Sequence, residues 1–85
     1  MLFRSGEGTT ASGDNSFAFG YADSTSTILS SGVGSVAHGR ATGNGNITSG
    51  GYGSVASGMC DNSTIRASGN GSVCTGYCDS SSAIT

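Results

Sequence analysis

A short pattern of small and apolar residues recurs along the chain at a nearly constant interval. Its core is Ser-x-Ala-x-Gly, in which the first x is always Phe or Val. The copies occupy residues 16–20, 35–39, 54–58 and 72–76, the last with Cys in place of Ala, so they start 19, 19 and 18 residues apart. An interval of this size predicts a solenoid in which each repeat forms one coil.

A second apolar position alternates with this motif. It holds Ile28, Ile47, Ile65 and Ile84, and Thr9 takes the same place near the start. Each repeat therefore predicts two short strands of four or five residues, joined by Gly, Asn, Asp and Ser turns. We expect an irregular entry or short capping coil at residues 1–13 and coils at 14–32, 33–50, 51–69 and 70–85. Coils spaced by roughly 4.8 Å would make a stack about 20 Å tall.

Strand alternation assigns the faces of each coil. The Ser, Ala and Gly positions of the motif share one face and are small, as a narrow interior requires, and the isoleucines are expected to fill the core behind the opposite strands. The first x positions form an apolar column that we expect to face a neighbouring chain; the alternative is that its valines fill the core of the coil itself. This column is Phe17, Val36, Val55 and Val73.

Two further columns vary in chemistry and are expected to meet solvent and partners. One consists of Phe19, His38, Ser57 and Thr75, and the other of Leu29, Thr48 and Arg66.

Composition changes this picture in two respects. Sixteen glycines and no proline in 85 residues would ordinarily indicate a flexible chain, but a disordered tract has no reason to keep Ile and Val in register. Large apolar residues are few, so association is expected to supplement the core. The net charge of −2, without any lysine, disfavours nucleic-acid binding, and no apolar run is long enough for membrane insertion.

The repeated motif resembles the head repeats of trimeric autotransporter adhesins, the YadA-like head, whose pattern is Asn-Ser-x-Ala-x-Gly. In that family the pattern is followed by x-x-Ala; the matching residues here are 15–22, 35–41 and their later copies, and the resemblance covers residues 7–85. Similar β-roll repeats occur in bacteriophage and cell-surface appendages. The resemblance implies an all-β, left-handed parallel β-roll, with three chains side by side in a surface fibre or adhesive head. This chain departs from the family in its longer repeat and in its cysteines.

The three cysteines stand where other coils have alanine. Cys60 and Cys78 occupy the same slot one coil apart, so stacking would bring their Cα atoms to roughly 4.8 Å, within disulfide range. Cys74 would be left over, or would meet its symmetry mates across a trimer axis. The alternative interpretation, which we favour, is that all three are small buried apolar residues.

Candidate catalytic and metal sites are weak. His38, the sole histidine, lies two coils from Cys74 and on the opposite face, so no Cys–His nucleophile is expected. Asp23, Asp61 and Asp79 share a turn column that suits calcium, but Asx turns explain it more simply. We expect no enzyme activity, no cofactor and no bound metal. Three Asn-x-Ser/Thr acceptor patterns, at Asn46, Asn62 and Asn70, matter only in a eukaryotic host.

The sequence thus predicts a non-enzymatic structural protein, a homotrimeric β-roll head, spike or fibre on a virion or cell surface. Its adhesive partner would be a host surface protein or glycan. A head-to-tail filament subunit is the alternative within the same class, because an open coil edge tends to pair. An ice-binding or carbohydrate-binding module is the alternative from another class, and it would require regular Thr ladders.

Overall fold

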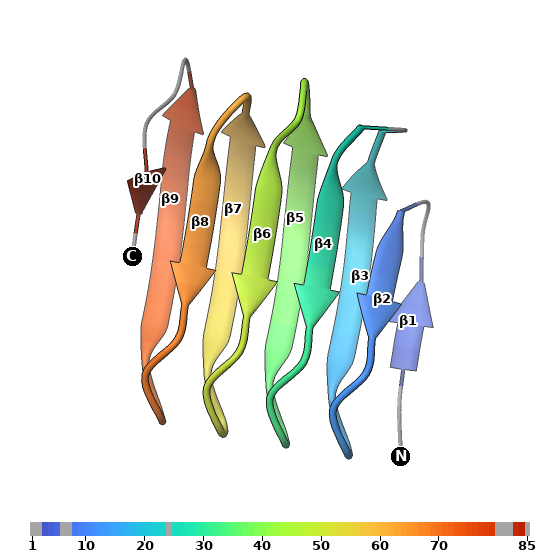
Figure 1. Ribbon diagram of the computed structural model, residues 1–85, viewed down its shortest axis with the longest axis vertical. Helices are drawn as coiled ribbons and strands as arrows, with labels where there is room; N and C mark the ends of the chain where they lie inside the picture. The colour runs from blue at the N-terminus through green and yellow to red at the C-terminus, as the bar shows by residue number, and fades with distance from the viewer. Residues whose placement is uncertain (1–2, 6–7, 24, 80–82, 85) are drawn as a thin grey trace.

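The computed structural model describes residues 3–5, 8–23, 25–79 and 83–84. The described chain is all-β and contains no helix. Its strands stack in parallel as a β-solenoid of about four turns, as the sequence predicts (Figure 1). Two five-stranded sheets lie back to back, and the chain passes from one sheet to the other after every strand.

Alternate strands build the two sheets. The odd sheet contains β1 (Phe3–Ser5), β3 (Phe17–Ala22), β5 (Val36–Thr42), β7 (Val55–Asp61) and β9 (Val73–Asp79). The even sheet contains β2 (Thr9–Ala11), β4 (Thr27–Ser30), β6 (Asn46–Ser49), β8 (Thr64–Ala67) and β10 (Ala83–Ile84).

Equivalent residues of successive repeats pair directly, so the sequence repeat is also the structural repeat. Val36 pairs with Val55, and Ile47 pairs with Ile65. The molecule measures 32 × 23 × 13 Å, and the strands run along the longest axis (Figure 1). The coils stack along the 23 Å axis, which is close to the predicted stack height of about 20 Å.

Strands β3, β5, β7 and β9 are longer than the predicted four or five residues, because each continues through its motif glycine. Gly20, Gly39, Gly58 and Gly76 have φ angles of 128°, 134°, 131° and 139°, a region that side chains rarely allow. A Cβ atom on Gly39 would lie 1.9 Å from the carbonyl oxygen of Gly58 in the next coil. Glycine thus lets the strand pass this close contact and continue to Ala22, Thr42 or Asp61.

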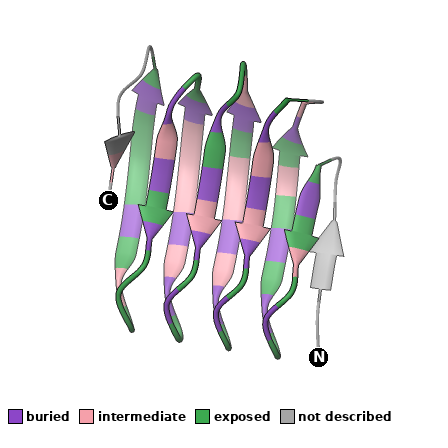
Figure 2. Cartoon of the chain, viewed as in Figure 1, coloured by how far each residue is buried: buried purple, intermediate pink, exposed green. Residues whose placement is uncertain are grey.

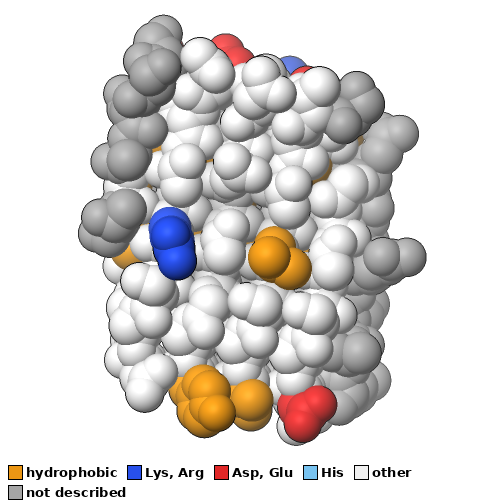
Figure 3. Space-filling model, viewed as in Figure 1, with side chains coloured by type: hydrophobic (Ala, Val, Ile, Leu, Met, Phe, Trp, Pro, Cys, Tyr) orange, Lys and Arg blue, Asp and Glu red, His pale blue; other side chains and the backbone are white. Residues whose placement is uncertain are grey.

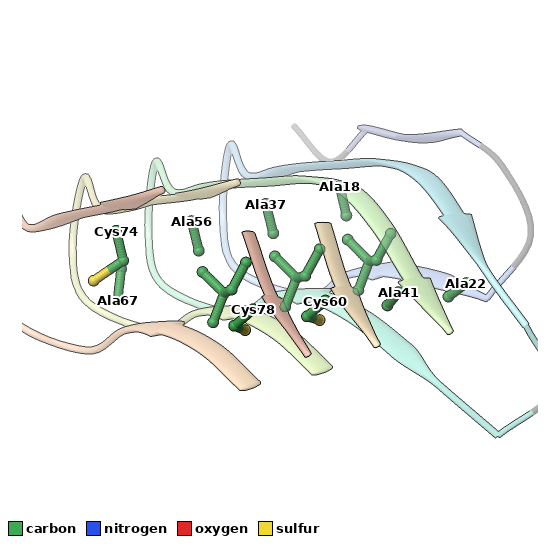
Figure 4. Packing of buried hydrophobic residues seen from close by; sticks show 12 residues of the cluster. Ala18, Ala22, Ala37, Ala41, Ala56, Cys60, Ala67, Cys74 and Cys78 are labelled. Carbon is green, nitrogen blue, oxygen red and sulfur yellow. The ribbon is translucent and has the colours of Figure 1, made fainter. Parts of the chain in front are cut away.

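The core lies between the two sheets and consists of small residues around an isoleucine ladder. Ile28, Ile47 and Ile65 are completely buried, which confirms the predicted ladder, and Thr9 is buried in the same register. The odd sheet contributes two inward columns of alanine and cysteine (Figure 4). Buried and exposed positions alternate along the strands as period-two geometry requires (Figure 2).

Buried serines link the two sheets at one end of the slab. The hydroxyls of Ser30 and Ser35 lie 2.6 Å apart, and those of Ser49 and Ser54 lie 2.7 Å apart. In the next coil Ala67 replaces the first serine, and the buried Ser72 hydroxyl has no hydrogen-bond partner among the described residues. The same coil carries Cys74 in place of the smaller alanine, directly beside Ala67 in Figure 4.

Candidate interaction surface

The outer face of the odd sheet carries the predicted apolar column. Phe17 is 41% exposed and Val73 is 66% exposed, whereas Val36 and Val55 are half-buried on the same face. The valines therefore do not fill the core, and the alternative that placed them there is wrong. Four apolar side chains stand in one line across the stack.

The second predicted column lies beside the first on this face. It brings Phe19, His38, Ser57 and Thr75 into one line of paired residues. The Phe19 and His38 rings stack in parallel, with centroids 4.8 Å apart and planes 2° apart. His38 is thus a partly exposed surface histidine, on the opposite face of the odd sheet from the buried Cys74.

A third outward column was not predicted. It follows the motif glycines and consists of Tyr21, Arg40, Met59 and Tyr77. Tyr77 is 62% exposed and Tyr21 is 44% exposed, so the column enlarges the apolar face considerably. The sequence shows a large side chain after each motif glycine. Such a residue predicts an outward column only if the strand continues through that glycine.

A fourth column, at the ends of the odd strands, is polar and acidic. Thr42, Asp61 and Asp79 are paired in register, and the Thr42 hydroxyl donates to the Asp61 carboxylate at 3.3 Å. Asp23 precedes them in the turn after β3. The outer face therefore changes from apolar at one end of the strands to acidic at the other.

The Asp23 carboxylate accepts hydrogen bonds from its own turn and from the next coil. It accepts hydrogen bonds from the Ser26 hydroxyl at 2.7 Å, from the backbone and hydroxyl of Thr25, and from the Gly43 backbone at 3.1 Å. The Ser26 bond, followed by the Gly43 bond, lowers the pKa of Asp23 from 3.8 to about 2. An Asx turn that also ties two coils together accounts for this aspartate, and the described residues hold no group of three potential acidic, His or Cys metal ligands.

The even sheet has a polar outer face, of which Figure 3 gives a direct view with few hydrophobic or charged side chains. Leu29 and Thr48 are half-buried and Arg66 is exposed, in one line as predicted. Beside them run Thr27, Asn46 and Thr64. Threonine thus alternates irregularly with other residues and makes no regular ladder.

The turns between the sheets add exposed residues that the sequence analysis did not single out. Val33 is 42% exposed and Tyr52 is 66% exposed, and both lie in the turns that precede odd strands. The three glycosylation-type asparagines, Asn46, Asn62 and Asn70, are exposed.

Cys60 and Cys78 pair in register as predicted, but they are free thiols in this structure. Each donates to a backbone carbonyl of the even sheet, Cys60 to Asn46 at 3.3 Å and Cys78 to Thr64 at 3.6 Å. Burial, with a smaller effect from the Cys78 thiol, raises the pKa of Cys60 to about 11. All three cysteines are buried free thiols in this structure and pack as small apolar residues, the interpretation favoured from the sequence.

The described surface contains no pocket, so the outer face of the odd sheet is its most distinctive feature. No described helix has the length and apolar character to cross a membrane. Comparison with protein-family models, curated proteins and solved structures finds no match.

Proposed function

We propose that this chain is a non-enzymatic structural protein, whose coils assemble as a homotrimer into a head, spike or fibre on a virion or cell surface. The observation that carries the proposal is the outer face of the odd sheet. Three of its four columns contain large apolar side chains, and Phe17, Phe19, Tyr21, Val73 and Tyr77 are all exposed. Contiguous apolar patches of this kind mark interaction sites in soluble proteins.

The thinness of the molecule supports association. The slab is only 13 Å deep, and its core consists largely of Ala, Ser and Cys around three buried isoleucines. Small domains bury a low fraction of their apolar surface, so a neighbouring copy on the apolar face would add the burial that one chain lacks. The polar outer face of the even sheet would then remain in solvent.

An adhesive role fits the variable columns. The outer face of the odd sheet, with the His38 column, would face neighbouring chains, and the Leu29 to Arg66 column on the solvent-facing even sheet would contact a host protein or glycan. Repeated coils present these columns in a fixed array, and three copies in one assembly would bind through several weak contacts at once.

The test is the absolute mass of the purified chain by light scattering, with and without reductant. A mass of about three times the 8.2 kDa chain would support the proposal. A folded monomer at all concentrations would overturn it. A lower mass in the presence of reductant would mean that disulfides join the chains. Cys74 would be the first cysteine to test by substitution.

Head-to-tail stacking is the second candidate. Within these 85 residues β9 is the last strand of the odd sheet, and its seven residues offer backbone groups for further parallel pairing. Very large, polydisperse material in the same experiment would favour it, and electron micrographs showing only discrete particles would count against it.

A further inference from the structure

Arg40 lies at the centre of the apolar face. It is on β5, the middle strand of the odd sheet, and it pairs in register with Tyr21 on one side and Met59 on the other. Its side chain is exposed and makes no hydrogen bond or ion pair with any described residue. Asp61, two residues beyond Met59 on β7, does not form a salt bridge with Arg40 inside the chain.

The occupant that fits this face is a second copy of the same chain. Across the side that carries this face the whole molecule extends 32 by 23 Å, roughly 700 Å², and a standard interface buries about 800 Å² on each partner. A second copy of the face is therefore large enough to cover it. It also carries matching apolar columns and an acidic column beside them.

Burial of Arg40 needs a counter-charge. A guanidinium removed from water without a carboxylate would oppose association strongly, so a stable assembly must bring an acid to it. The acids that point outward from the odd sheet are in the fourth column, at Asp61 and Asp79. Among the described residues, the Asp61 carboxylate accepts one weak hydrogen bond, from the Thr42 hydroxyl at 3.3 Å, and it can accept another partner.

We infer that Arg40 of one copy pairs with Asp61 of a neighbouring copy, and that this contact sets the register of the assembly. The inference rests on the proposed self-association. It holds whether the assembly is a trimer or another closed form, because every copy carries both partners. A charge pair of this kind favours one relative position of the two contacting faces. Apolar columns alone would let one face slide past the other along the stack.

The test uses charge reversal on the full 85-residue chain. Arg40→Glu and Asp61→Arg should each weaken association at least about 30-fold, measured by sedimentation and light scattering over a concentration series. An equimolar mixture of the two variants should associate more tightly than either alone, because each then offers the other an opposite charge. Arg66→Glu, on the even sheet, is the matched control and should associate like the unaltered chain.

Three outcomes would overturn the inference. Mixing without recovery would show that the pair does not form between chains. Association of Arg40→Met as tight as that of the unaltered chain would show that Arg40 stays in solvent. If the unaltered chain associates but Asp61→Arg has no effect, the carboxylate comes from elsewhere. A monomeric unaltered chain would instead overturn the proposed function itself, so the two failures are distinguishable.

Discussion

At the residue scale, the motif glycines carry the tightest steric constraint in the molecule. The first three lie against the glycine of the next coil, and a Cβ atom on Gly20, Gly39 or Gly58 would come within about 2 Å of a backbone oxygen (2.1, 1.9 and 1.9 Å). Backbone atoms in a stacked sheet cannot move aside as the end of a flexible side chain can. The glycine column therefore sets how closely the coils stack.

Gly39→Ala should destabilise the fold by at least about 3 kcal/mol, because it combines the clash with an unfavourable φ. Gly50→Ala is the control, since its Cβ would meet only the Ser31 hydroxyl at 3.6 Å. It should change the free energy of unfolding by less than about 1 kcal/mol. Urea denaturation of both variants measures the difference, and equal midpoints would contradict the steric argument.

Cys60 should make the free energy of unfolding fall as the pH rises above 9. Its pKa is raised from 9.0 to about 11 in the folded chain, so the folded form holds the proton more tightly than the unfolded form. This contribution is fully present below pH 9 and is lost as pH rises from 9 to 11. Thermal unfolding at pH 8 and pH 10.5 should show a smaller loss for Cys60→Ala than for the unaltered chain. An equal loss in both would assign the effect to other groups.

At the element scale, the two sheets are joined by isoleucine packing and by buried serine pairs. The pairs Ser30–Ser35 and Ser49–Ser54 satisfy hydroxyls that would otherwise be costly in a dry interior. The coil that contains β8 and β9 departs from this pattern at two positions, Ala67 and Cys74. Ala67 is smaller than the serine it replaces, and Cys74 is larger than the alanine it replaces, so the two changes compensate in volume.

Restoring the earlier pattern in this coil should stabilise it. Ala67→Ser in a Cys74→Ala background should give the orphan Ser72 hydroxyl a partner and raise the free energy of unfolding by about 1 kcal/mol over Cys74→Ala alone. Ala67→Ser by itself should gain less, because Cys74 occupies part of the space. A double-mutant cycle by urea denaturation measures the coupling, and strictly additive effects would refute the compensation.

At the scale of the whole molecule, the slab has two unlike faces. The odd sheet presents aromatic and aliphatic columns, whereas the even sheet presents threonine, asparagine and few apolar groups. Because both sheets share one core, their outer faces can differ without altering the fold. A change on the outer face of the odd sheet should therefore weaken association, a change on the outer face of the even sheet should not, and both should leave folding largely intact.

Val55→Asp should weaken self-association at least about 10-fold, because it places an unpaired charge among apolar columns. Thr48→Asp makes the same kind of change on the even sheet and should leave the mass unchanged. Light scattering over a concentration series measures both, with circular dichroism to verify that each variant is folded. Equal weakening by the two variants would mean that the odd face is not the interface.

Prediction from sequence succeeded where it depended on local geometry. Strand alternation placed Val36 and His38 outside and Ala37 inside, and the constant interval placed Ile47 beneath Ile65. It failed at Arg40 and its column, because glycine usually weakens or ends a strand. Only the packing of one coil on the next shows that these glycines adopt positive φ and let the strand continue.

The sequence by itself determined the coil repeat, the inward and outward faces and the isoleucine core, because each follows from a period that neighbouring residues impose. The tertiary structure decided how wide the outer face is, which charged side chains lie on it, and which buried hydroxyl lacks a partner among the described residues. The first two features arise between residues of successive coils, such as Arg40 and Met59, and the third arises between the two sheets of one coil. These contacts exist only after the coils have closed and stacked.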